Sequence, residues 1–133
     1  MNPLNRLFSG GQGTEETVVW WELRRIPFNL IVGAVGLASV IVMELFGSTF
    51  IKPGEDFAEP IALLLGTILF GLIANVGYTL CWMMEGEIPF DEPEKRQVFR
   101  TKNFKLALKW SCACATLPVW FCLLAWVEHV ASA

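Results

Sequence analysis

The chain has few of the residues from which catalytic and metal sites are usually built. Its one histidine, His129, lies close to the C-terminus and has no set of partner residues around it in the sequence. Cys112 and Cys114 are two residues apart, so in a helix they point about 200° away from each other and cannot hold one ion together. No phosphate-binding glycine loop, GxSxG motif or HExxH motif is present. We therefore expect that the chain is not an enzyme and that it binds neither a metal ion nor another cofactor.

The usual signs of secretion are missing as well. Residues 1–13 contain no apolar core of a cleavable signal, and we interpret them as a flexible cytosolic tail. All four cysteines fall inside apolar blocks, which is not the pattern of a secreted disulfide framework: Cys81, Cys112, Cys114 and Cys122. We interpret these thiols as small apolar packing residues.

Charge is nearly absent from three long stretches of the chain. Hydrophobic residues make up 54% of the 133 residues, close to the share of a soluble domain, but here they are gathered in blocks with the charges between them. About 20 apolar residues of helix cover a hydrocarbon core of about 30 Å. We predict an all-α integral membrane protein, a single domain over residues 14–133. Its three transmembrane helices should lie at about 27–46, 60–84 and 104–127, with a cytosolic loop at 85–103.

An amphipathic stretch stands before the first predicted span. At about 100° per residue, Val19, Trp20, Leu23 and Ile26 share one helical face. Pro27 follows, and a proline at this place is expected to bend the chain into the span. The pattern predicts a short N-terminal amphipathic helix that lies in the membrane interface.

Tryptophan and arginine residues are placed where the two membrane interfaces are expected. Trp20 and Trp21 each precede an arginine by four residues, so each indole can stack on a guanidinium. Such residues suit the headgroup layer. The expected interfacial anchors are Trp20, Trp21, Arg24, Arg25, Trp82 and Trp126.

Basic residues are almost missing from one side of the predicted membrane. Lys52 is the one basic residue expected on that side. The others fall on the opposite side: Arg6, Arg24, Arg25, Lys95, Arg96, Arg100, Lys102, Lys105 and Lys109. Because lysine and arginine are retained on the cytosolic side, the N-terminus should be cytosolic and the C-terminus outside. We expect the protein in a bacterial inner membrane.

Polar residues recur along one side of the second predicted span. Thr67, Gly71, Asn75 and Thr79 stand four residues apart and form one stripe. Polar groups in hydrocarbon need partners, and Asn29 near the inner end of the first span is a candidate partner for Asn75. Two interpretations stay open: contact between helices, or the lining of a pore in an oligomer. Glu44, an acid near the outer end of the first span, either reaches the outer headgroups or contributes to a ring of carboxylates at a pore mouth.

A basic segment lies at the cytosolic end of the third predicted span. Its members are Lys95, Arg96, Arg100, Lys102, Lys105 and Lys109. One interpretation is contact with anionic lipid headgroups, worth about 1 kcal/mol per charge near the surface. The other is a site for an anionic cytosolic ligand such as a nucleotide or oligonucleotide, for which the cations would have to converge. The acids between Glu85 and Glu94 argue against the second, because they neutralise cations in the same loop.

The run Ile88-Pro89-Phe90-Asp91-Glu92-Pro93-Glu94 resembles the PFD-x-PE loop of the quinone-site membrane subunit of complex I and its hydrogenase relatives. The resemblance covers these seven residues. That family has many more spans, and the charged residues that surround its loop are not matched here. The resemblance implies a quinone-linked redox subunit.

Three spans without a soluble domain are few for a monomeric transporter, which usually needs paired repeats around a site at the midplane. Our first hypothesis is a homo-oligomeric channel or membrane-permeabilising effector that is gated from the cytosol, as in bacterial anti-phage defence. The alternative is a non-catalytic accessory or scaffold subunit of a larger membrane complex. The expected partners are the lipid bilayer, copies of this chain and other membrane subunits.

Overall fold

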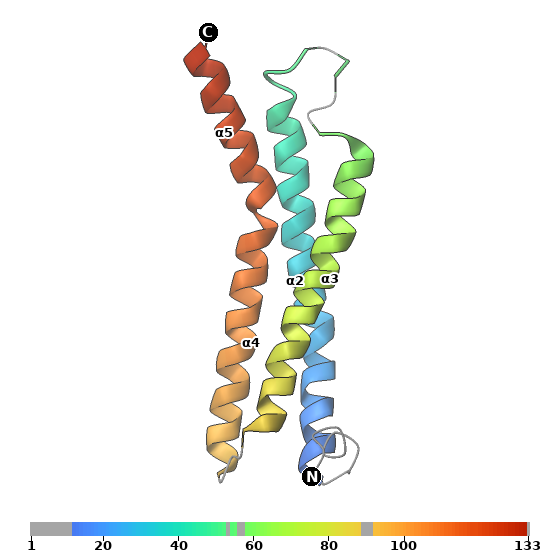
Figure 1. Ribbon diagram of the computed structural model, residues 1–133, viewed down its shortest axis with the longest axis vertical. Helices are drawn as coiled ribbons and strands as arrows, with labels where there is room; N and C mark the ends of the chain where they lie inside the picture. Colours follow the sequence, from blue (N-terminus) through green and yellow to red (C-terminus); the bar gives the residue numbers. More distant parts are fainter. Residues whose placement is uncertain (1–11, 53, 56–57, 89–91, 133) are drawn as a thin grey trace.

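Three long helical passes make up the part of the chain that the computed structural model describes, namely residues 12–52, 54–55, 58–88 and 92–132. The helices are α2 (Gln12–Gly47), α3 (Pro60–Glu87), α4 (Pro93–Ala115) and α5 (Leu117–Ser132), and the described residues include no strand. Figure 1 shows that α3 runs back alongside α2 and that α4 continues into α5. Three stretches are long and apolar enough to cross a membrane: Glu16–Gly47, Pro60–Glu87 and Pro93–Ser132. The predicted all-α chain with three such helices is confirmed.

The predicted short interfacial helix is not a separate element, because α2 continues through Pro27. A proline inside a helix removes one backbone hydrogen bond and usually bends the helix. Here aromatic packing holds both sides of Pro27 against one residue of α3: the rings of Trp21 and Phe28 lie 5.2 Å and 4.7 Å from the ring of Tyr78. All three aromatic side chains are fully buried. The separate helix was therefore the wrong prediction for these turns, and the expected bend does not divide α2 into two helices.

The second helix begins where the sequence indicates and ends later than expected. Glu59 is the N-cap of α3, its carboxylate accepts a hydrogen bond from the backbone N of Ala62 at 2.9 Å, and Pro60 follows at the first helical position. The helix then continues to Glu87, and α4 starts at Pro93. The loop predicted at 85–103 is therefore too long, because most of its charged residues belong to helical turns.

The third pass is divided at Thr116, where α4 ends and α5 begins. Thr116 has φ −87° and ψ −4°, and its backbone N donates to the carbonyl of Ala113 at 3.2 Å. Pro118, two residues later, has no backbone N–H to donate to the turn before it. Figure 1 shows the change of direction between α4 and α5 at this point.

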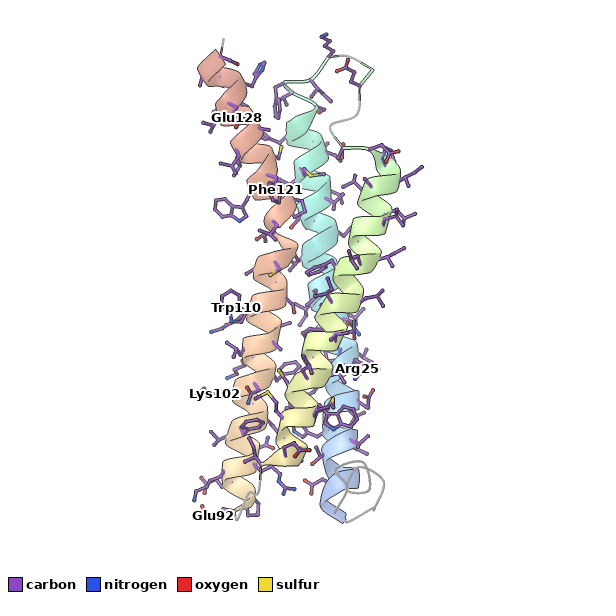
Figure 2. All side chains as sticks on the ribbon, viewed as in Figure 1. Arg25, Glu92, Lys102, Trp110, Phe121 and Glu128 are labelled. Atoms are coloured by element: carbon purple, nitrogen blue, oxygen red, sulfur yellow. The ribbon has the colours of Figure 1, made fainter. Side chains whose placement is uncertain are left out.

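Apolar side chains mostly face outward. In the most apolar windows of the three long stretches, 22%, 11% and 11% of residues are buried inside the chain, so these helices do not enclose a conventional core. Trp110 projects away from the bundle in Figure 2 and is 66% exposed, and Phe121 is 65% exposed. The buried cluster is small and comes from α2 and α3, with partly buried side chains of α4 packed against it: Trp21, Phe28, Val32, Ala74 and Tyr78. Outward apolar surface is what a lipid environment requires.

Basic residues are concentrated at one end of the bundle. The start of α2, the end of α3 and the start of α4 lie together at this end, which we call the basic end (Figure 1). Lys52 belongs to the connection between α2 and α3 at the opposite end, where α5 also finishes. Arg6, one of the basic residues used for the predicted orientation, lies outside the described residues. The three passes thus place the two groups of charges at opposite ends, as the sequence predicts.

Candidate functional site

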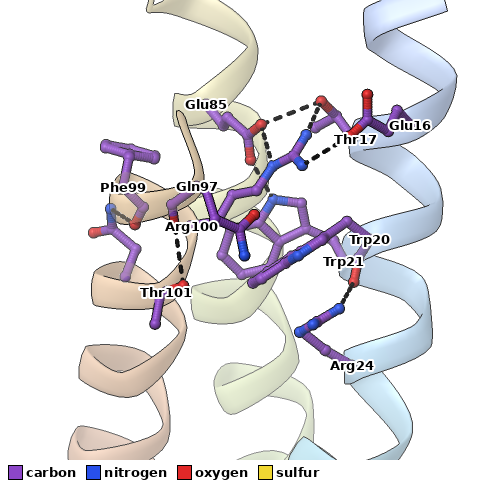
Figure 3. A network of polar contacts seen from close by, with 11 residues as sticks. Glu16, Thr17, Trp20, Trp21, Arg24, Glu85, Gln97, Phe99, Arg100 and Thr101 are labelled. Atoms are coloured by element: carbon purple, nitrogen blue, oxygen red, sulfur yellow. Dashed lines mark hydrogen bonds and ion pairs between the residues drawn. The ribbon is translucent and has the colours of Figure 1, made fainter. Parts of the chain in front are cut away.

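A buried ion pair joins α3 to α4 at the basic end. The Arg100 side chain is 3% exposed and the Glu85 side chain is 1% exposed. The Nε of Arg100 donates to Oε1 of Glu85 at 2.7 Å (Figure 3). Removing two charges from water is costly, so a pair of this kind persists only with good geometry and further hydrogen bonds.

Those further hydrogen bonds come from α2. A guanidinium N of Arg100 donates to Oγ1 of Thr17 at 2.7 Å, and the Thr17 hydroxyl donates to Oε1 of Glu85 at 3.2 Å. The indole Nε1 of Trp21 donates to the second carboxylate oxygen, Oε2, at 2.7 Å. The remaining guanidinium N of Arg100 lies 3.6 Å from Oε1 of Glu16, whose side chain is 75% exposed. We call Glu16, Thr17, Trp21, Glu85 and Arg100 the buried network. It joins three helices through one carboxylate and one guanidinium.

Aromatic rings form one wall of the buried network. The ring of Trp20 meets the ring of Trp21 edge to face at 5.0 Å, and the guanidinium carbon of Arg100 lies 5.6 Å from the Trp20 ring centre. The hydroxyl of Tyr78 donates to the backbone carbonyl of Trp21 at 2.6 Å. These rings keep water from the ion pair and hold the turn of α2 that carries Thr17. A low local dielectric strengthens every hydrogen bond in the network.

Of the two predicted stacks of arginine on tryptophan, one is present. The guanidinium of Arg24 lies 3.8 Å from the ring centre of Trp20. The stack of Arg25 on Trp21 is the wrong prediction, because Trp21 turns inward to reach Glu85. Arg25 instead forms an ion pair with Glu22 at 3.1 Å and donates to Oγ1 of Thr79 at 3.3 Å.

The two asparagines meet as the sequence suggests. Nδ2 of Asn29 donates to Oδ1 of Asn75 at 3.3 Å, and Nδ2 of Asn75 donates to Oδ1 of Asn29 at 2.9 Å. Asn75 also donates to the backbone carbonyl of Gly71 at 2.9 Å. The inner half of the stripe therefore faces α2. The outer half does not: Thr67 is exposed and donates to its own helix at Leu63, and a Cβ built at Gly71 would meet no other atom within 4 Å.

The basic segment does not converge into one ligand site. Arg100 points into the bundle, whereas Lys102, Lys105 and Lys109 are exposed on the other side of α4. The reason is helical phase, because residues two apart point about 200° from each other. Lys95 forms an exposed ion pair with Glu92 at 3.0 Å. The convergence that the soluble-ligand interpretation requires is therefore absent for Arg100 and Lys102.

The other predicted site residues lie apart from the buried network. Glu44 is half-buried, and its Oε1 is a buried atom without a hydrogen-bond partner in the described part of the chain. Trp82 packs beside the small core, and Trp126 lies 5.9 Å from the ring of Phe46 near the opposite end. Arg96 is half-buried near the start of α4.

No group of three or more histidine, cysteine, aspartate or glutamate residues in the described ranges could hold a metal ion. Cys81, Cys112, Cys114 and Cys122 are free thiols. The heptapeptide that resembles the quinone-site loop lies partly outside the described residues, since 89–91 are not among them. No family model, characterised protein or solved structure matches the chain.

Sequence reasoning missed most of the buried network. Glu85 was assigned to a cytosolic loop and Arg100 to an external ligand or lipid, and Thr17 was given no role. One signal was available: Thr17 and Trp21 stand four residues apart and thus share a face of α2. That face could be paired with Glu85 only once the packing of three helices was known.

Proposed function

We propose that this chain is a non-catalytic accessory or scaffold subunit of a larger membrane complex, with the basic end in the cytosol. The support comes from where the polar groups are used. The polar groups of the buried network form hydrogen bonds with one another, and Asn29 and Asn75 form hydrogen bonds with each other. Together these contacts join three helices. These groups therefore stabilise a pre-ordered membrane unit and leave no aligned set of reactive side chains in the described residues.

The observation that carries the proposal is the uncovered outer half of α3. Among residues 60–73 no side chain is buried, and the buried residues of α3 all come later in the helix. Ala62, Gly66 and Gly77 share one exposed face, because spacings of 4 and 11 residues return to nearly the same helical angle. A Cβ built at Gly66 or Gly77 would meet nothing within 4 Å. Small residues of this kind let the backbone of another membrane helix approach closely.

The experiment compares the same substitution on two faces of α3. Gly66→Leu adds bulk to the proposed subunit face, and Gly71→Leu adds the same bulk about 140° away, on the polar stripe. The tagged chain is purified from native membranes in mild detergent, and the mass of the intact assembly is measured. A subunit role predicts that a hetero-complex of defined composition is lost in Gly66→Leu and kept in Gly71→Leu. Equal retention in both variants would contradict the proposal.

A homo-oligomeric channel or membrane-permeabilising effector is the second candidate. The observation that favours it is the outer half of the polar stripe, where Thr67 is exposed and Gly71 has open space beside it. A pore of this kind would lie between copies of the chain. The purified chain alone would then form a ring of defined mass and release ions from vesicles, and Gly71→Leu would block the release. A subunit role predicts no release from either form.

A further inference from the structure

Three lysines form a ladder on the outer face of α4. Lys102, Lys105 and Lys109 stand at positions i, i+3 and i+7, so they fall within an arc of about 60° on the helix. All three are exposed, and they point away from the buried Arg100. They extend over about 10 Å of the helix axis at about 1.5 Å per residue. The positive charges of the basic segment are thus divided between the buried guanidinium of Arg100 and the exposed amines of the three lysines.

A shallow groove accompanies the start of the ladder. It has a volume of about 430 Å³ and is lined by Gln97, Val98, Thr101, Lys102 and Lys105. Farther along the same helix, Leu106 and Trp110 are 48% and 66% exposed. The surface therefore changes from polar and basic near the basic end to apolar and aromatic deeper in the helix. An amphiphile with an anionic headgroup and hydrocarbon chains would match this change from basic to apolar surface.

Carboxylates do not neutralise the ladder from the neighbouring turns of its own helix. The sequence contains no acid between Glu94 and Glu128. None of the ion pairs among the described residues includes Lys102, Lys105 or Lys109, and the nearby Glu85 already pairs with Arg100. The three amines consequently present positive charge outward.

Helix geometry tilts all three side chains toward the basic end. In an α-helix each Cα–Cβ bond tilts toward the N-terminus, and long side chains lean the same way. The N-terminus of α4 lies at the basic end, so the stem of Lys109 leads back toward Lys105 and Lys102. Lysine stems can lie along apolar surface while the amines reach the polar layer. The amine of Lys109 can therefore extend toward the level of Lys105, beside the apolar surface of α4.

We propose that this face of α4 binds anionic phospholipid, with the phosphate held by Lys102, Lys105 and Lys109 and the acyl chains along Leu106 and Trp110. The shared charge would also attract a soluble anion. Lipid is the favoured occupant because Lys109 stands beside exposed apolar side chains within a stretch long and apolar enough to cross a membrane. A soluble nucleotide has no hydrocarbon chains to cover that surface.

The test uses the delipidated full chain in detergent and native mass spectrometry. Dioleoylphosphatidylglycerol and dioleoylphosphatidylcholine are titrated separately, and the lipid-bound fraction is measured. Lys105→Gln is expected to weaken phosphatidylglycerol binding about fivefold, the effect of one lysine near an anionic surface. Lys95→Gln removes one charge from the same helix, where Glu92 already pairs with it, and is the matched control, with no change expected. Lys105→Arg keeps the charge and is expected to keep the binding.

The outcomes separate the alternatives. Equal affinity of the wild-type chain for the two lipids would overturn the proposal, and so would equal losses in Lys105→Gln and Lys95→Gln. ATP is added as a soluble anion in a third titration. If ATP binds as tightly as phosphatidylglycerol and displaces it, the ladder is a soluble-anion site and the lipid assignment is wrong. Retention of binding in Lys105→Arg with loss in Lys105→Gln would support the role of charge over that of shape.

Discussion

The buried ion pair between Glu85 and Arg100 predicts a strong coupling between two substitutions. Arg100→Met leaves a carboxylate that is 1% exposed without its counter-charge, although Trp21 and Thr17 still donate to it. Glu85→Gln replaces one of the two accepting oxygens with an amide N–H2. This donor then faces another donor, either the Trp21 indole N–H or the Arg100 guanidinium. Breaking a buried pair from one side typically costs about 3–5 kcal/mol. The residual contact of Arg100 with Glu16 adds little, because Glu16 is largely exposed.

The double variant Glu85→Gln/Arg100→Met should be more stable than either single variant. With the guanidinium gone, the glutamine oxygen accepts from Trp21 and its N–H2 donates to Thr17, so each polar group has a partner. Replacing both members of a buried pair is often nearly neutral. The coupling energy is therefore expected to be about 3 kcal/mol, at the upper end for residues in contact.

The assay is reversible unfolding of the purified chain in mixed micelles as the fraction of denaturing detergent rises. Circular dichroism follows helix content, and tryptophan fluorescence follows the surroundings of the six tryptophans, of which Trp21 belongs to the buried network. The exposed pair of Glu92 and Lys95 supplies the control cycle: its atoms are 3.0 Å apart, but its side chains are 58% and 64% exposed. That pair should couple by less than about 1 kcal/mol. If the Glu85 and Arg100 substitutions are additive within about 0.5 kcal/mol, the buried pair is not the linkage described above.

Three further predictions concern other contacts. Trp21→Phe keeps most of the ring packing but removes the N–H that donates to Glu85, so it should destabilise the chain by about 1.5–3 kcal/mol in the same unfolding assay; a value near zero would show that the indole N–H is dispensable. Asn75→Leu should cost about 1 kcal/mol, since it removes both hydrogen bonds with Asn29, and the Asn29→Leu/Asn75→Leu double variant should cost little more; full additivity would contradict their pairing. Cysteines engineered at Thr49 and Glu87 should react with an impermeant thiol reagent from outside and from the cytosol, respectively; the reverse labelling would invert the orientation.

The helices were predictable from sequence because each depends on local chemistry. Three apolar blocks indicate three long helices whatever their neighbours are. Glu59 and Pro60 form a helix start by hydrogen bonding and backbone geometry within a few residues. The contact between Asn29 and Asn75 was also within reach, because each is a polar residue that needs a partner in an apolar helix.

The buried network could not be predicted from the sequence, for a different reason. Charged residues such as Glu85 and Arg100 were assigned to a loop on the premise that charge lies in water. Their burial depends on a partner from another helix, and on Thr17 and Trp21 of a third. Periodicity along one helix does not show which faces of three helices meet. For the same reason, aromatic packing across Pro27 could not be foreseen from the proline itself.

The residues of the buried network are synthesised at different times. Thr17 and Trp21 are made first and Glu85 second, but Arg100 follows Glu85 by 15 residues. At about 5–20 residues per second, the ribosome adds that interval in about one to three seconds. During this interval the nascent chain carries the Glu85 carboxylate without its counter-charge. Helices α2 and α3 can meet through Tyr78 and the asparagines before then, but the basic end closes only when the first turns of α4 arrive. Helix α4, which is made after α2 and α3, thus completes the junction between them.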